Sequence, residues 1–166
     1  NDVKPFVNCV PLYDLKAAAG RFGDEQEVKE LIQGKWDENI ADIDWVELPD
    51  AFRPRPGLFV AQVVGESMNR RIPNGSWCLF SLNPVGSRQG KIILAQHKDI
   101  SDTDTSGQYT VKRYESRKKV LADGTWRHES ITLRPDTTVP GYSPFIFDET
   151  LGRDVRVIAE LVAVLG

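Results

Sequence analysis

The stretch LFVAQVVGESMNRRIPNGSWCLFSL, residues 58–82, decides the fold class. It contains two short apolar runs, Leu58 to Val64 and Trp77 to Ser81, whose length and content of β-branched and aromatic residues are typical of strands. The turn signal Pro73-Asn74-Gly75 stands between them. Two strand-like runs joined through turn chemistry, without a helical repeat, predict a mainly β fold.

The same pattern continues towards the C-terminus. Four more strand-like runs follow: Lys91 to His97, Tyr109 to Ser116, Ser130 to Leu133 and Val155 to Leu165. The last run is almost continuously apolar, which is typical of a central or interface strand, although a helix also fits it. We therefore predict a mainly β domain over residues 45–166.

Towards the N-terminus the pattern changes. Asp24 is a suitable N-cap for a helix over Glu25 to Gln33, and Gly34 is a suitable end. Residues 35–44 are acidic with scattered apolar positions and fit either a second short helix or a loop. We expect residues 1–44 to form an N-terminal segment that contains this short helix.

The composition excludes several classes of protein. Of the 166 residues, 40% are hydrophobic and 27% are charged, which is typical of one folded domain and not of a disordered chain. The net charge of −3 predicts no direct nucleic-acid binding, because such binding relies on Lys and Arg at the phosphates. The chain has no apolar run of transmembrane length and no signal-peptide pattern, so we expect a cytoplasmic protein without a membrane anchor.

The cysteines and histidines do not suggest a metal or redox site. Cys9 and Cys78 each lie among apolar residues, and neither has a CxxC partner, so buried free thiols are favoured over a disulfide. His97 and His128 stand in unrelated polar surroundings without other ligands at metal-binding spacing. We expect no metal and no cofactor.

A candidate nucleophile follows the first of the strand-like runs. Gly65-Glu66-Ser67-Met68 would present Ser67 on a small-residue turn, where neighbouring backbone amides can face a developing oxyanion. A serine in such a turn is more often a structural cap, so Ser67 needs a second residue to indicate catalysis. Neither histidine is suitably placed to be its base.

Lysine is the other base for a serine nucleophile, provided that burial lowers its pKa. Lys112 is the candidate, because it stands in the strand-like Tyr109-Thr110-Val111-Lys112-Arg113-Tyr114 among apolar and aromatic residues. The alternative is a strand lysine on a solvated face, which periodicity alone favours.

The ordered combination of these motifs resembles the LexA and UmuD family of serine-lysine peptidases over roughly residues 45 to 165. The matching elements are Val63 to Met68, Ile72-Pro73-Asn74-Gly75-Ser76, Gly90 to Ile93, Tyr109 to Arg113, Ile131 to Asp136 and Val155 to Ala159. The resemblance implies a LexA/signal-peptidase-like β fold, with Ser67 as nucleophile, Lys112 as neutral general base, and the backbone amides near Glu66 and Ser67 as oxyanion hole.

The resemblance also implies a substrate and partners. Family members cut an Ala-Gly or Cys-Gly bond in their own upstream segment, and Ala17-Ala18-Ala19-Gly20 resembles that region, with Ala19-Gly20 as the candidate scissile bond. The same run could also be a plain helix end. A homodimer, a recombinase filament as activator, and an SOS, DNA-damage or phage-repressor response are implied by the family alone.

Two long spacings depart from the family's compact members. Gly20 and Ser67 are 47 positions apart, which brings intramolecular cleavage at Ala19-Gly20 into question. Ser67 and Lys112 are 45 positions apart, with the extra length in the polar segment Asp99 to Gln108. We expect that segment to be a surface loop that leaves the dyad intact.

Other functions remain compatible with the sequence. The chain could be a non-catalytic dimerisation or binding module, with the run Val155 to Leu165 pairing at a sheet edge, or the peptidase domain of a larger DNA-processing or defence protein. A type I signal peptidase fits poorly because the chain has no membrane anchor. The basic residues Arg70, Arg71, Arg113 and Arg117 to Lys119 are expected to be solvated rather than to flank a cleft.

Overall fold

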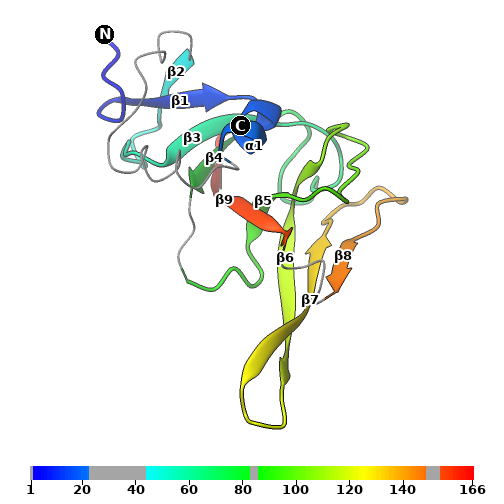
Figure 1. Ribbon diagram of the computed structural model, residues 1–166. Coiled ribbons are helices and arrows are strands. Elements are labelled where there is room, and N and C mark those ends of the chain that lie inside the picture. Colours follow the sequence, from blue (N-terminus) through cyan, green and yellow to red (C-terminus); the bar gives the residue numbers. More distant parts are fainter. Residues whose placement is uncertain (1, 23–43, 83–85, 149–153) are drawn as a thin grey trace.

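The computed structural model describes residues 2–22, 44–82, 86–148 and 154–166 and is mainly β, as the sequence predicts (Figure 1). Within these residues the strands form one mixed sheet of nine strands, in the order β2-β1-β3-β4-β9-β5-β6-β7-β8. The elements are β1 (Cys9–Tyr13), α1 (Leu15–Phe22), β2 (Asp44–Glu47), β3 (Leu58–Val63), β4 (Ser76–Leu82), β5 (Ile92–Gln96), β6 (Tyr109–Val120), β7 (Trp126–Arg134), β8 (Phe145–Asp148) and β9 (Arg156–Val164). Only β1 and β3 pair in parallel among these neighbours.

All six strand-like runs of the sequence are strands, and they form β3, β4, β5, β6, β7 and β9. The sequence did not predict β1, β2 and β8. These strands are short, and β1 contains Pro11, so none carries a clear alternation. The helix predicted over Glu25 to Gln33 lies outside the described residues, and the division of the chain at residue 44 stays a prediction.

The last strand, β9, is internal to the sheet, which confirms the central placement of this apolar run and excludes the helical alternative. β5 pairs with β9 over Arg156 to Glu160, and β4 pairs with it over Ala159 to Val164. β9 is thus not an edge strand of this sheet, and Ala159 and Glu160 have a strand partner on both sides. A dimer contact through this strand stays a prediction.

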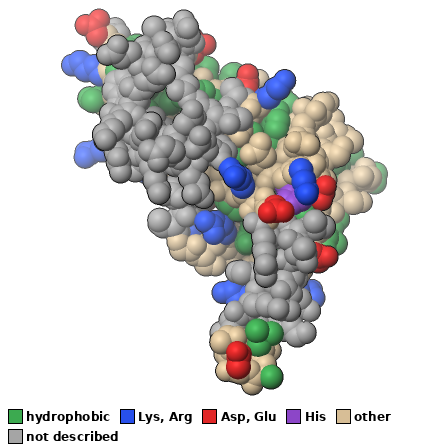
Figure 2. All heavy atoms as spheres, viewed as in Figure 1, with side chains coloured by type: hydrophobic (Ala, Val, Ile, Leu, Met, Phe, Trp, Pro, Cys, Tyr) green, Lys and Arg blue, Asp and Glu red, His purple; other side chains and the backbone are tan. Residues whose placement is uncertain are grey.

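The β6–β7 hairpin extends as a long arm away from the rest of the sheet (Figure 1). Arg117 and Lys118 lie on this arm and are exposed, as expected for solvated side chains. On the face drawn in Figure 2, lysine and arginine side chains are spread over several elements and stand among acidic ones. Among the described side chains of this face, lysine and arginine do not gather into a single basic patch.

The main core lies between α1 and the sheet. Leu15, Ala18 and Ala19 of α1 pack in one buried cluster with Phe59 of β3 and Phe80 of β4, whose rings stack with centroids 5.4 Å apart. This helix has only two turns and gains its stability from such packing rather than from intrinsic propensity. Among the described residues, no helix has the length and apolar character to span a membrane.

Candidate active site

Ser67 lies in the turn that follows β3, as the sequence predicts. Gly65 has a φ of +103°, a conformation that glycine adopts readily, and its amide donates a hydrogen bond to Asn74 Oδ1 at 2.7 Å. After Ser67, the side chains of Met68 and Ile72 are buried in the main core. Because the turn is anchored at both ends, the buried Ser67 has a fixed position.

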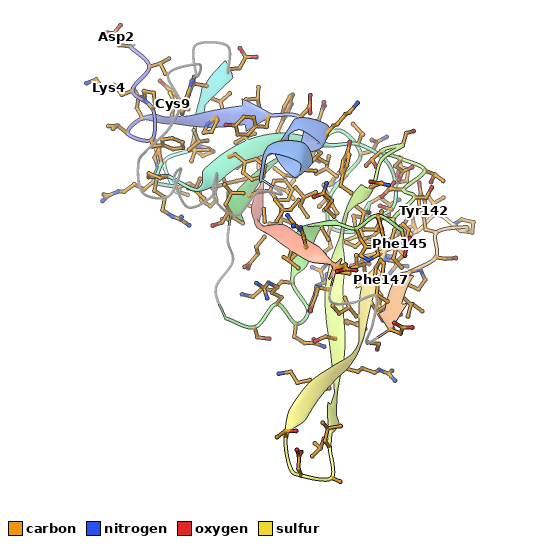
Figure 3. The ribbon with its side chains drawn as sticks, viewed as in Figure 1. Asp2, Lys4, Cys9, Tyr142, Phe145 and Phe147 are labelled. Carbon is orange, nitrogen blue, oxygen red and sulfur yellow. The ribbon has the colours of Figure 1, made fainter. Side chains whose placement is uncertain are left out.

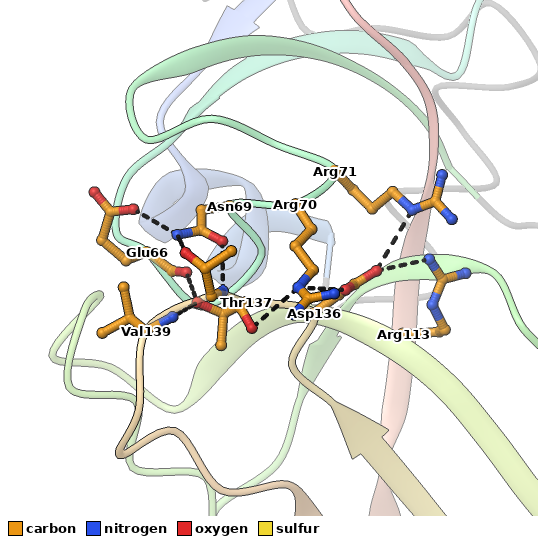
Figure 4. Close-up of polar contacts among 9 residues, drawn as sticks. Glu66, Asn69, Arg70, Arg71, Arg113, Asp136, Thr137 and Val139 are labelled. Atoms are coloured by element: carbon orange, nitrogen blue, oxygen red, sulfur yellow. Dashed lines mark hydrogen bonds and ion pairs between the residues drawn. The ribbon is translucent and has the colours of Figure 1, made fainter.

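A second segment, Asp136-Thr137, donates hydrogen bonds to two carbonyl groups of this turn, and Figure 4 draws the bond from Thr137 to Glu66. The Asp136 amide donates to Ser67 O at 2.9 Å, and Thr137 Oγ1 donates to Glu66 O at 2.6 Å. In a trans peptide the N–H points opposite to the carbonyl of the same unit. The amides of Ser67 and Met68, which share peptide units with these two carbonyls, therefore point away from the Asp136-Thr137 segment.

Three arginines surround the side chain of Asp136 in the same region (Figure 4). Arg71 Nε and Arg113 Nη2 each lie 3.4 Å from Asp136 Oδ2, and Arg70 Nε lies 3.9 Å from Oδ1. Arg70 and Arg71 are largely exposed. The expectation that these side chains are solvated thus holds for both, although all three arginines also help to fasten the segment that holds Ser67.

Lys112 lies on β6, opposite Ile93 of β5, and points into the protein instead of to solvent. Its exposed fraction is 3%, which excludes the solvated-face alternative. Its Nζ is 2.9 Å from Ser67 Oγ. The fold therefore brings together the two residues that the sequence selected, although they are 45 positions apart.

Four acceptors surround Lys112 Nζ. Besides Ser67 Oγ, they are Thr110 Oγ1 at 2.6 Å, Val111 O at 3.1 Å and Asp102 Oδ2 at 3.3 Å. The Phe145 ring lies 5.9 Å from Nζ and provides an apolar face. An ammonium has three N–H donors and a neutral amine has two, so this set of acceptors suits the charged form better.

Two opposing effects act on the pKa of Lys112. Burial is the larger one and lowers the pKa below the ordinary lysine value, because an ammonium loses solvation inside a protein. The negative charge and hydrogen bond of Asp102, together with the charge of Asp104, act in the opposite direction and raise it. Burial prevails, so Lys112 loses its proton more readily than an exposed lysine does.

Asp102 reaches Lys112 from the segment that the sequence identified as an inserted loop. The segment between β5 and β6 is indeed a loop, but Asp102 is 7% exposed, and its Oδ2 also accepts a 2.5 Å hydrogen bond from Thr110 Oγ1. Asp102 Oδ1 accepts the amides of Asp104 and Thr105, which fixes the carboxylate. The insertion leaves the contact between Ser67 and Lys112 intact, and it places the buried Asp102 carboxylate beside Lys112, which the sequence does not indicate.

The same loop packs directly on the turn before Ser67. A Cβ on Gly65 would clash with the Asp104 carboxylate, because the Asp104 side chain lies directly against the Gly65 backbone. Tyr142 donates a hydrogen bond to Asp104 Oδ1 at 2.9 Å, and its hydroxyl also interacts with the backbone of Glu66. Figure 3 shows Tyr142 beside Phe145, on the side of the molecule opposite the N-terminal Asp2 and Lys4.

Ala19 and Gly20, the candidate scissile pair, lie within α1. Ala19 is 2% exposed and packs in the main core, which also contains Met68 of the serine turn. The helical alternative for this run is therefore the one seen. Cleavage between these two residues stays a prediction.

His97 and the two cysteines lie in the protein interior. His97 is buried against the Phe147 ring, and its Nδ1 accepts a hydrogen bond from the amide of Asp99. Both cysteines are buried free thiols, as predicted. Within the part of the chain that is described, no group of three or more His, Cys, Asp or Glu side chains could hold a metal ion.

Sequence reasoning missed Thr110 and Asp102. Thr110 had a signal, since side chains two apart in a strand share a face and Thr110 precedes Lys112 by two positions. Asp102 had none, because only the path of the loop brings it to Lys112.

Most of the chain matches a known protein family. The chain matches the family model described as Peptidase S24-like over residues 11–123, which is more than half of its length. The matched range contains Ser67, Lys112 and the Ala19-Gly20 pair. Among curated proteins, none matches the chain.

Proposed function

Because the chain belongs to the Peptidase S24-like family, we propose that it is a self-cleaving serine endopeptidase in which Ser67 is the nucleophile and Lys112 the general base. The observation that carries this proposal is the 2.9 Å separation of Lys112 Nζ and Ser67 Oγ, with both side chains buried. A nucleophile and its base must lie within such hydrogen-bonding distance for proton transfer.

In the proposed reaction, neutral Lys112 takes the proton from Ser67 Oγ as this oxygen attacks the scissile carbonyl. The new C–O bond gives a tetrahedral intermediate, whose collapse breaks the C–N bond. The leaving amine receives the proton from Lys112. Neutral Lys112 then takes a proton from a water molecule, whose oxygen attacks the acyl-serine carbonyl. The C–O bond to Ser67 breaks, and Lys112 returns the proton to Ser67 Oγ, which restores both groups.

The oxyanion of that intermediate needs N–H donors near Ser67. We propose the amides near Glu66 and Ser67 for this role. The direction of the Ser67 amide, away from Asp136-Thr137, supports it, and the Met68 amide has an equivalent orientation. The Glu66 backbone is engaged with Tyr142, so that contact would have to open if the Glu66 amide is to take part.

The proposed substrate is the chain's own Ala19-Gly20 bond. A peptide bond must be extended to approach a serine nucleophile in an attack geometry. Ala19 is helical and buried, so cleavage requires α1 to unwind and to leave the core. An eight-residue helix is marginally stable by itself, so the cost of opening α1 is chiefly the loss of its packing against the sheet.

From the family we also propose a biological setting. The protein would act in a cytoplasmic response of the SOS or phage-repressor type, as a homodimer whose cleavage is promoted by a recombinase filament. The opening of α1 is the step on which such an activator would act.

The test is to follow the intact mass of the purified chain at several pH values, beside the Ser67→Ala variant. We expect first-order loss of the piece that ends at Ala19 in the parent alone. A synthetic peptide with the sequence of residues 10–26, added to the Ser67→Ala and parent proteins, tests cleavage without the need to open α1. If the parent cuts neither itself nor the peptide at any pH, the peptidase proposal is wrong.

A second candidate function is a binding or assembly module that keeps the peptidase fold without cleavage. The burial of Ala19 in α1 favours it, because the candidate bond is not presented. Such a module would show concentration-dependent association that Ser67→Ala and Lys112→Ala leave unchanged. Sedimentation velocity of the three proteins distinguishes this outcome. With either function, self-cleavage or binding, the chain could be one domain of a larger DNA-processing or defence protein.

A further inference from the structure

We propose that Asp102 is a positioning residue of the dyad: its carboxylate holds Lys112 Nζ beside Ser67 and stabilises the ammonium form, and thereby sets the pH range in which the dyad acts. This inference rests on the proposed function for its catalytic meaning. Its physical content, the control of the charge on Lys112, is measurable without any cleavage.

The geometry makes Asp102 part of one connected set of groups. Lys112 Nζ donates to Thr110 Oγ1, and Thr110 Oγ1 in turn donates to Asp102 Oδ2. The same carboxylate oxygen lies 3.3 Å from Nζ. Asp102 therefore contacts Lys112 both directly and through Thr110, and these contacts fix the direction in which Nζ points.

The position of Asp102 is itself fixed by its loop. Its Oδ1 accepts the amides of Asp104 and Thr105, while backbone hydrogen bonds join residue 102 to Ser106 and Gly107. Both Asp102 and Lys112 are more than nine-tenths buried. In such surroundings an ion pair is only weakly screened by solvent and salt.

The other charged groups near the dyad make no direct contact with Lys112. Asp104 acts on Lys112 through space; its Oδ1 accepts a hydrogen bond from the Tyr142 hydroxyl, and its buried Oδ2 has no hydrogen-bond partner among the described residues. Glu66 Oε2 accepts Asn69 Nδ2, and Arg113, the next residue on β6, binds Gly90 O and Asp136. Asp102 is therefore the acidic side chain that touches Lys112 within the described part of the chain.

The same carboxylate has two opposite consequences for the proposed reaction. By orienting Nζ, it supports a high rate once Lys112 is neutral. By stabilising the ammonium, it keeps Lys112 from accepting the proton of Ser67 until the pH is high enough. Loss of the Asp102 charge should therefore move the midpoint of the pH–rate profile towards acid and lower the plateau rate.

The experiment is an NMR titration of Lys112 in the full chain, with its signals assigned by their absence in Lys112→Ala. The parent is compared with Asp102→Asn and with Asp99→Asn, which removes the same charge from an exposed position of the same loop. We expect the Lys112 midpoint to move towards acid in Asp102→Asn and to stay unchanged in Asp99→Asn. An unchanged midpoint, or one that moves towards alkali, in Asp102→Asn overturns the proposal.

Self-cleavage of the same proteins gives the catalytic readout. At neutral pH, where the parent is still below its plateau, Asp102→Asn should cleave itself on the order of tenfold faster than the parent. At high pH, its plateau rate should be lower than that of the parent. Asp102→Glu, which retains the charge, should keep the parent midpoint. If no protein cleaves at any pH, the peptidase proposal fails, and the NMR midpoint alone decides the role of Asp102.

A folding control keeps the test decisive. Near-ultraviolet circular dichroism shows whether Asp102→Asn keeps the native packing. If it does not, Asp102→Ser removes the same charge but keeps an oxygen that can accept the amides of Asp104 and Thr105. This variant should also move the Lys112 midpoint towards acid, and an unmoved midpoint there overturns the proposal.

Discussion

Thr110 Oγ1 lies 2.6 Å from Lys112 Nζ, and the two residues stand two positions apart on β6. Side chains at this spacing share one face of a strand, so the backbone itself sets Thr110 beside the candidate base. The hydroxyl accepts from Nζ and donates to Asp102, which makes it the bridge between the amine and the carboxylate.

We therefore predict that Thr110→Val slows self-cleavage and that Thr110→Ser largely restores it. Valine has the same shape but cannot bridge the two groups. The expected loss is roughly one to two orders of magnitude, the rate equivalent of a hydrogen bond to a charged group. Single-turnover rates from intact-mass measurements check this, and equal rates for the valine and serine variants would contradict it.

The pH dependence of cleavage follows from the state of Lys112. Burial lowers the pKa of Lys112, and the amine accepts the Ser67 proton only when it is neutral. The rate should rise with pH up to a plateau, with a midpoint below that of an ordinary lysine. Lys112→Ala and Lys112→Arg should each reduce the rate by about 10²-fold or more at every pH. Full activity of either variant at neutral pH would remove Lys112 from the mechanism.

Asp102 should make the protein sensitive to acid. Burial by itself raises the pKa of Asp102, but the positive charge of Lys112 and the hydrogen bonds from Thr110, Thr105 and Asp104 outweigh it and lower the pKa below the ordinary value of 3.8. A carboxyl with a lowered folded pKa contributes stability above its unfolded pKa, and this stability is lost as pH falls through the folded value.

We accordingly predict that Asp102→Asn lowers the free energy of unfolding by about 1–3 kcal/mol at neutral pH. The difference from the parent should shrink as the pH falls below about 4. Urea unfolding at a series of pH values measures both effects, and Asp99→Asn is the matched control. A difference that grows towards acid pH would refute the assigned charge.

Gly65 should not tolerate a side chain. Its φ of +103° is strained for alanine, and a Cβ there would clash with the Asp104 carboxylate. We predict that Gly65→Ala destabilises the protein by roughly 1–3 kcal/mol. It should also slow self-cleavage because the turn that carries Ser67 must shift. Gly124→Ala, at a positive φ with no atom near the added Cβ, separates backbone strain from the contact with Asp104.

Cys78 should be unreactive in the folded protein. Desolvation by burial raises its pKa to about 12, so very little thiolate forms at ordinary pH. In the Cys9→Ala variant, a thiol reagent at about pH 8 should label Cys78 only after unfolding in urea. Rapid stoichiometric labelling of the native variant would show that the thiol is accessible.

The sequence was sufficient for much of this fold. The apolar runs that form β3, β4, β5, β6, β7 and β9 follow from local alternation, length and the turn residues between them. The short strands β1, β2 and β8 gave no such signal, because their positions depend on pairing with neighbours distant in sequence. The run at Ala17 to Gly20 fitted both a cleavage region and a helix end, and its helical structure became clear only from its packing against the sheet.

The candidate site divides in the same way. Ser67 and Lys112 could be selected from the sequence, because each stands in a local motif and the motifs occur in the order of a known family. Their 2.9 Å contact, the burial of Lys112 and the approach of Asp102 are products of the tertiary structure alone. Strand periodicity and turn chemistry are short-range properties that a sequence displays directly. The charge on a buried amine depends on which carboxylate the chain folds against it, and a loop between two strands has no periodicity from which that contact could be read.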